Sequence, residues 1–255
     1  MTSFVWEREP SEAFSEPYEY GGQEQFSREA QAVLEDLKFH YSKLNHSFSR
    51  EDKSVEKAVW LLQVDSLSAL YEGLMLIGEK RHRIASRLFR DVIETMDASL
   101  YFSQAGLKSR TNLEKWYKDE VIPHRVCREF IKKHQGEDKF ERLRSVYRDL
   151  SKYTHRTYRA LLMSYMLGKD DNLAYDGFRK YDTDYALPHV ISFSYAVLGM
   201  LIKRFVEFSI ITNQITVDEA KEIWRNCLEP ETVPRRFGSG SGQIMRGPPT
   251  KIDFS

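Results

Sequence analysis

The sequence predicts an all-α protein, an antiparallel helical bundle with added C-terminal helices. Apolar residues recur at three- and four-residue spacing over most of positions 23–228, which is typical of helices that bury one face. No convincing run of strict alternation, as in a half-buried strand, interrupts this pattern. Prolines and glycines gather near the two ends. We therefore expect one bundle domain over residues 23–228, between a flexible or draped N-terminal arm (1–22) and a disordered C-terminal tail (229–255).

The first half of the bundle is predicted as three long helices. One spans roughly 23–46, and a second runs from an N-cap at Ser49 or Ser54 to about position 78. A third covers about 80–103, and Gly106 suits its C-terminal stop. Each carries an apolar stripe wide enough to face a core, which favours antiparallel packing between neighbours.

The second half is predicted as shorter helices followed by two further ones. An element that begins near 109–111 is divided by Pro123, which suits the first position of a new helix. The next helix runs from about 137 to 167, with a kink or break if Ser151 or Thr154 caps a fresh start. The remaining elements are a long loop over 168–185, a helix over 187–212, and a last helix opened by the capping box from Thr216 to Glu219.

Composition limits the classes of function. Acidic and basic residues are equal in number, 38 of each, so the whole chain has no field that attracts nucleic acid, and any such binding needs a local patch. The most apolar stretch, 190–202, is too short to cross a bilayer and is followed by Lys203 and Arg204. We therefore expect a buried core helix and no membrane contact.

The two cysteines and the N-terminal sequence bear on the cellular compartment of the protein. Cys127 and Cys227 lie far apart and neither has metal-ligand spacing. A disulfide between them is allowed in principle, but two thiols in a chain of this size favour a reducing environment. The first residues lack the basic start and apolar run of a secretory signal. We expect a cytoplasmic protein that holds no metal and no cofactor.

The strongest functional candidate is the segment from Arg148 to His155. In an unbroken helix, seven steps return to within about 20° of the starting direction, so the two side chains would share one face, with Ser151 and Lys152 between them. A guanidinium holds phosphate oxygens with forked donors, and an imidazole titrates near neutral pH. Together they predict metal-free cleavage of a phosphodiester.

A plainer interpretation of the same segment is an ordinary polar helix face. Arg148 would then be paired with Asp149 or Glu141. Roughly one or two Arg-x(4–6)-His matches are expected by chance in a chain of this composition. A second match, Arg128 to His134, does occur in a very basic run. The spacing alone is therefore a weak signal, and its helical context adds weight.

That context resembles the HEPN superfamily, the higher eukaryotes and prokaryotes nucleotide-binding domains. The family is all-α and is marked by an Arg followed by Asn, Asp or His, with a His a few residues further on. Here Asp149 follows Arg148, and the stretch 146–155 is similar to the last-helix signature of HEPN-like bacterial proteins. The stretch 85–94, in which Arg90 precedes Glu94 by four, is similar to an internal helix of those families. The resemblance covers about residues 55–170.

The resemblance implies a homodimeric ribonuclease in which two copies of the pair face each other. A ribose 2′-hydroxyl would attack its adjacent phosphate and leave a cyclic phosphate. His155 would move the proton as general base or acid, and Arg148 would stabilise charge on the phosphoryl oxygens. Asp149 would orient either side chain, and Ser151 would donate to a phosphate oxygen. No metal is required.

A basic stripe on the third predicted helix has two interpretations. Arg83, Arg87, Arg90 and Glu94 fall at positions i, i+4, i+7 and i+11, so they follow one side of the helix. Arg83 and Arg87 could line a groove for an RNA backbone. Alternatively the stripe is salt-bridged, with Arg90 and Glu94 as an intrahelical pair. If that pair faces inward, it would support the Arg148 and His155 site.

These observations predict a metal-independent endoribonuclease of a bacterial toxin or antiphage defence system. The alternative is a non-catalytic HEPN-like helical module that binds a nucleotide, RNA or protein partner, such as an antitoxin or defence component. The Tyr- and Asp-rich loop over 168–185 favours a packing or partner-binding role, because its carboxylates would repel phosphate. An immunity or antitoxin protein that uses the fold without chemistry is a third interpretation.

Overall fold

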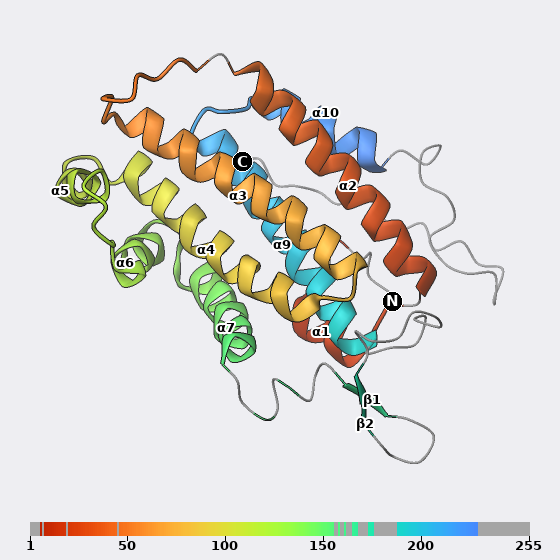
Figure 1. Cartoon of the computed structure of the whole chain (residues 1–255). Helices are drawn as coiled ribbons and strands as arrows, with labels where there is room; N and C mark the ends of the chain where they lie inside the picture. The colour runs from red at the N-terminus through yellow and green to blue at the C-terminus, as the bar shows by residue number, and fades with distance from the viewer. Residues whose placement is uncertain are drawn as a thin grey trace.

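The computed structural model describes residues 6, 8–18, 20–44, 46–155, 158, 161, 165–167, 173–175 and 188–228. Its helices pack as a bundle, which confirms the all-α fold class (Figure 1). The helices are α1 (Pro10–Ser15), α2 (Tyr20–Lys43), α3 (Val55–Gly78), α4 (His82–Gln104), α5 (Leu107–Trp116), α6 (His124–Gln135), α7 (Glu137–Thr154), α9 (Pro188–Ile211) and α10 (Val217–Leu228).

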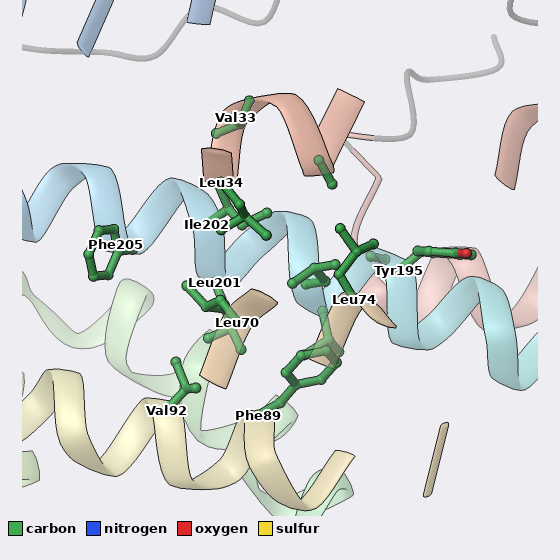
Figure 2. Close-up of a cluster of buried hydrophobic side chains, with 14 of the residues drawn as sticks. Val33, Leu34, Leu70, Leu74, Phe89, Val92, Tyr195, Leu201, Ile202 and Phe205 are labelled. Carbon is green, nitrogen blue, oxygen red and sulfur yellow. The ribbon is translucent and has the colours of Figure 1, made fainter. Parts of the chain in front are cut away.

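Helix α9 forms the centre of the bundle, and α1, α2, α3, α4 and α10 pack against it. Side chains from α2, α3, α4 and α9 meet in one apolar cluster (Figure 2). Leu201, Ile202 and Phe205 of α9 are completely buried there. The segment 189–211 is long and apolar enough to cross a membrane, but 78% of its most apolar window is buried inside the bundle, as expected for a core helix. Its bounds, Pro188–Ile211, agree with the helix predicted over 187–212.

Helices α6 and α7 pack on the side of α4 that faces away from α2 (Figure 1). They place the second half of the predicted HEPN-like region beside its first half. Close packing within the bundle is clearest between α3 and α4, where a Cβ atom built on Gly73 would lie 2.3 Å from the Phe89 ring. Only glycine allows this approach of the two helices.

The described part of the predicted flexible or draped arm (1–22) packs against the bundle, and it contains helical residues that were not predicted. Helix α1 lies between Glu9 and Glu16, with Pro10 at its first turn, and α2 already begins at Tyr20. The Trp6 side chain is 3% exposed and its indole N–H donates to Glu29 at 2.5 Å. Burial of this large apolar ring favours an ordered segment, which a lack of helical periodicity does not exclude.

Several predicted helix ends are confirmed. Ser54 caps α3, where its hydroxyl accepts from the Lys57 backbone N–H at 3.2 Å. The capping box of α10 is formed, because the Thr216 N–H donates to the Glu219 carboxylate at 2.7 Å and the Glu219 N–H donates to the Thr216 hydroxyl at 3.2 Å. The Thr216 backbone N–H and the Thr216 hydroxyl both donate to the Glu219 carboxylate, and these two bonds lower the pKa of Glu219.

The continuous helix predicted to reach about position 167 is broken. Helix α7 ends at Thr154, and His155 has extended backbone angles of φ −82° and ψ 142°. Further on, β1 (Tyr165–Leu167) and β2 (Leu173–Tyr175) pair antiparallel, with Tyr165 opposite Tyr175, where helix and loop were expected. Apart from β2, the predicted loop over 168–185 lies outside the described residues, and so does all of the predicted tail over 229–255.

Candidate functional site on α7

Arg148 lies on the outward side of α7. The buried stripe of this helix consists of Phe140, Leu143, Val146, Leu150 and Tyr153, and helical geometry places position 148 about opposite to it. The Arg148 NH2 group donates to the Ser145 hydroxyl at 3.4 Å. No carboxylate in the described part of the chain lies within ion-pair distance of it. The guanidinium therefore extends from an exposed surface.

His155 is also exposed and directly follows Thr154, the last residue of α7. Its φ of −82° lies near the helical value, whereas its extended ψ of 142° ends the helix after it. The six steps from 148 to 154 span about 9 Å of helix. The shared face of the two side chains therefore stays a prediction. Two cavities formed by described residues, of about 890 and 350 Å³, include neither side chain in their lining.

The polar residues between them make contacts of their own. Lys152 Nζ lies 2.6 Å from Asp149 Oδ1, and the Ser151 hydroxyl donates to the Tyr147 carbonyl at 2.7 Å. Among the described residues, no hydrogen bond or ion pair joins Arg148 to Asp149 or Ser151. Glu141, the other proposed partner of Arg148, instead pairs with Arg144 at 2.9 Å. Both alternatives for pairing Arg148 with a neighbouring carboxylate are thus absent from the described contacts.

The basic stripe of α4 faces α7. Arg90 Nε donates to Glu94 and to the Tyr147 hydroxyl, both at 3.1 Å, and the Tyr147 hydroxyl donates to Glu94 at 2.5 Å. The predicted intrahelical pair is therefore confirmed, with about one third of each of the two side chains exposed. Burial raises the pKa of Tyr147, and its hydrogen bond to Glu94 raises it further.

The other two arginines of the stripe lie nearer the start of α4. Arg83 Nε donates to the Tyr153 carbonyl at 3.4 Å, so one cation lies at the C-terminal end of α7, where the helix dipole favours positive charge. Arg87 is exposed. The two segments that resemble HEPN proteins, 85–94 and 146–155, therefore contact each other through Arg90 and Glu94 of α4 and Tyr147 of α7. Arg83, just before the first segment, adds its contact to Tyr153.

A buried charged cluster lies beyond this contact and was not predicted. Asp97 of α4 is 1% exposed, and its carboxylate contacts His124 Nε2 at 2.8 Å and Arg204 NH2 at 2.5 Å. The His124 ring lies 5.2 Å from that of Tyr147, so the polar contacts run across α4, α6, α7 and α9. The sequence does offer one signal for this cluster. Asp97 and Arg204 are charged residues within the apolar stripes of α4 and α9.

Cys127 lies on α6 one turn after His124, near Asp97. A thiol, an imidazole and a carboxylate form a familiar set for nucleophilic catalysis. Here the thiol is 2% exposed, and burial together with the charge of Asp97 raises its pKa to about 12. A protonated, buried thiol is a poor nucleophile, so the set is a structural cluster.

No protein-family model, curated protein or solved structure matches this chain. The resemblance to HEPN proteins therefore stays a prediction. Within the described residues, no three His, Cys, Asp or Glu side chains gather as a metal site would require.

Proposed function

We propose that this chain is a metal-independent endoribonuclease that works as a homodimer. The observation that carries the proposal is the exposed Arg148 guanidinium, opposite the buried stripe of α7 and without an acidic partner among the described residues, with an exposed His155 at the end of the same helix. A cation held out in this way is available to a phosphate. RNA would bind along a surface formed by Arg83, Arg87, Arg148, Lys152 and His155, which we call the α4–α7 basic edge.

The chemistry follows from these two groups. His155 accepts the proton of a ribose 2′-hydroxyl, whose oxygen forms a bond to the adjacent phosphorus. The bond from phosphorus to the 5′-oxygen breaks, that oxygen takes up a proton, and a 2′,3′-cyclic phosphate remains. Arg148 stabilises the negative charge that builds on the non-bridging oxygens. Arg83, which is held at the end of α7, and Arg87 contact neighbouring phosphates.

A second copy of the chain completes the site. Within one copy, no hydrogen bond among the described residues joins Arg148 to His155. Two copies that face each other along α7 would bring Arg148 of one copy to His155 of the other. The likeness to HEPN toxins supports a cytoplasmic role in a toxin or antiphage system.

The test is RNA cleavage by purified protein in EDTA. We expect His155→Ala and Arg148→Ala each to lower the cleavage rate by at least about 100-fold, the range that general acid–base groups contribute. Arg144→Ala is the matched control, because Arg144 lies on the same outward side of α7 but pairs with Glu141; it should retain activity. Sedimentation should show a dimer. Undiminished cleavage by the His155 variant would remove the proposal.

The second candidate is a non-catalytic module that binds a nucleotide, RNA or protein partner. The break in α7 and the engagement of Asp149 and Ser151 with other groups favour it. Such a module would bind RNA without cleaving it. Its RNA affinity would fall on replacement of Arg83 and Arg87 by alanine, whereas His155→Ala would have no effect on cleavage because none occurs.

A further inference from the structure

The larger of the two cavities lies at the other end of α4 from the α4–α7 basic edge. It has a volume of about 890 Å³ and opens between the start of α3, the end of α4 and helix α5 (Figure 1). Arg87 belongs to the basic edge and Phe102 to the cavity lining, and α4 rises about 22 Å between them. A volume of this size lies within the range of small-molecule sites, about 300–1,000 Å³. The cavity is therefore a candidate site that is separate from the proposed ribonuclease site.

The inner wall of this cavity is apolar. Phe102 of α4 and Leu113 of α5 line it, and both are buried in an apolar cluster separate from the central one. Val55 and Tyr117 pack against the same cluster. Leu107, which also lines the cavity, is 84% exposed, and a side chain of this kind gains free energy when a ligand removes it from water. The cavity thus offers apolar surface both inside and at its opening, as an aliphatic chain requires.

Hydrogen bonds hold the walls of the cavity in place. The Tyr117 hydroxyl donates to the Ser54 carbonyl at 2.7 Å and so joins the end of α5 to the start of α3. The Ser109 hydroxyl donates to the Gly106 carbonyl at 2.9 Å, where α4 is connected to α5. Lys57 Nζ donates to three backbone carbonyls of the loop before α3, at 2.8, 2.9 and 2.9 Å. Walls that are fixed before a ligand arrives lower the entropic cost of binding.

The charged side chains of the lining leave an excess of one positive charge. Among the described residues, three are basic and two are acidic: Lys53, Arg110, Lys118, Glu56 and Glu114. Arg110 Nε lies 3.9 Å from the Glu114 carboxylate, so these two charges offset each other. Glu56 lies in the first turn of α3, where the helix dipole stabilises a negative charge. A ligand with a single negative charge would balance the excess.

Lys53 and Lys118 are the two cations available to such a ligand. Both side chains are exposed, and neither forms an ion pair within the described part of the chain. They directly precede Ser54 and follow Tyr117, whose hydrogen bond joins the two segments. The fold therefore brings two unpaired ammonium groups to one cavity, where they can donate charge-assisted hydrogen bonds to a carboxylate.

We propose that this cavity binds the free anion of a fatty acid, with its carboxylate at Lys53 and Lys118 and its chain against the apolar wall. Each methylene group that the wall removes from water strengthens binding by about threefold. The lining has only one excess positive charge, so an anion with several charges suits it less well. The proposal goes beyond the ribonuclease function and does not rest on it.

The probe is decanoate, measured by titration calorimetry on the full chain. We expect wild-type protein to bind decanoate at least about tenfold more tightly than hexanoate, because the shorter chain buries fewer methylene groups. Decanoate should also bind at least about fivefold more tightly than decanol, which has the same chain but no negative charge. The first comparison tests the apolar wall, and the second tests the lysines.

Two variants and their matched controls locate the site. Leu107→Asp should weaken decanoate binding by at least about tenfold, whereas Val121→Asp changes a side chain that is 91% exposed but lies outside the lining. Lys118→Glu should also weaken binding by at least about tenfold, whereas Lys115→Glu changes an exposed lysine of α5 outside the lining. Both controls should stay within about twofold of wild type.

Three results would overturn the proposal. They are no decanoate binding by wild-type protein at about 1 mM ligand, equal affinities for decanoate and decanol, or equal decanoate affinities of wild type and Leu107→Asp. Circular dichroism checks that this variant is folded, as expected for an aspartate in the first turn of a helix. If it is not, Leu107→Ser replaces it, and its decanoate binding should still be weaker than that of wild type. RNA cleavage should be unchanged in the Leu107 variant, which separates this test from that of the ribonuclease.

Discussion

The inward and outward sides of α7 use neighbouring residues for opposite purposes. Tyr147 points to α4, where its hydroxyl contacts Arg90 and Glu94. Arg148, the next residue, is exposed and contacts only Ser145 among the described residues. Within the stretch 146–155, Tyr147 thus joins α7 to α4, whereas Arg148 is exposed and can contact a ligand.

The inward side also belongs to a larger polar region. From Tyr147 the contacts continue through the His124 ring to Asp97 and Arg204. Charged groups buried in this way are costly unless each is paired, because removal from water is strongly unfavourable. The inward contacts should therefore matter for stability, whereas the outward ones should not, and four substitutions can test this difference.

The largest effect is expected at Asp97. Asp97→Ala would leave Arg204 and His124 without their carboxylate, and loss of one partner from a buried ion pair costs about 3–5 kcal/mol of unfolding free energy. The measurement is urea denaturation of the variant and of wild type at pH 7.

Asp149→Ala is the matched control for this substitution. Asp149 also contacts a cation at close range, Lys152 at 2.6 Å, but its side chain is 37% exposed. An exposed pair contributes about 0–1 kcal/mol. If the two aspartate variants lost equal stability, burial would not be the factor that separates the two sides of the molecule.

A smaller loss is expected for Tyr147→Phe. The change removes one hydroxyl that bridges Arg90 and Glu94, and a partly exposed hydrogen bond of this kind contributes about 1 kcal/mol. Thermal unfolding of the variant beside wild type measures it. An unchanged melting temperature would show that the hydroxyl does not join α4 to α7.

The same hydroxyl predicts a difference at alkaline pH. The folded chain raises the pKa of Tyr147 above its ordinary value of 10.0, so the unfolded chain loses this proton first as the pH rises. The stabilising contribution is therefore complete below about pH 10 and is lost as the pH passes through the folded-state pKa. Above pH 10, the unfolding free energy of wild type should fall more steeply than that of Tyr147→Phe. Parallel curves would contradict this assignment.

Most of the fold followed from the sequence because it depends on local patterns. The Ser54 cap, the capping box at Thr216 and the apolar stripe of α9 each act within one or two helical turns, and the structure contains all three. Local patterns did not predict the structure of the N-terminal segment. Its order depends on Trp6, which packs against Phe26 and Trp224 from distant parts of the chain, and periodicity carries no information about such contacts.

The candidate site was predicted less well for the same physical reason. The pair formed by Arg90 and Glu94 is local and was expected, but its link to Tyr147 crosses 53 residues. Whether Arg148 and His155 share a face depended on one helix end. The sequence allowed a break at Ser151 or Thr154 without deciding between that and a continuous helix. Asp97 and Arg204 are 107 residues apart, so only the packing of α4 against α9 brings them together.

The smallest effect on stability is expected at Arg148 itself. Arg148→Ala removes an exposed side chain whose described hydrogen bond, to Ser145, is long at 3.4 Å, and surface substitutions of this kind change the unfolding free energy by less than about 0.5 kcal/mol. Urea denaturation should give superimposable curves for this variant and wild type. A variant that keeps its stability but loses RNA cleavage would place the function of Arg148 in chemistry at the surface. A loss above about 1 kcal/mol would instead give the outward side a structural role, and the contrast with Tyr147 would not hold.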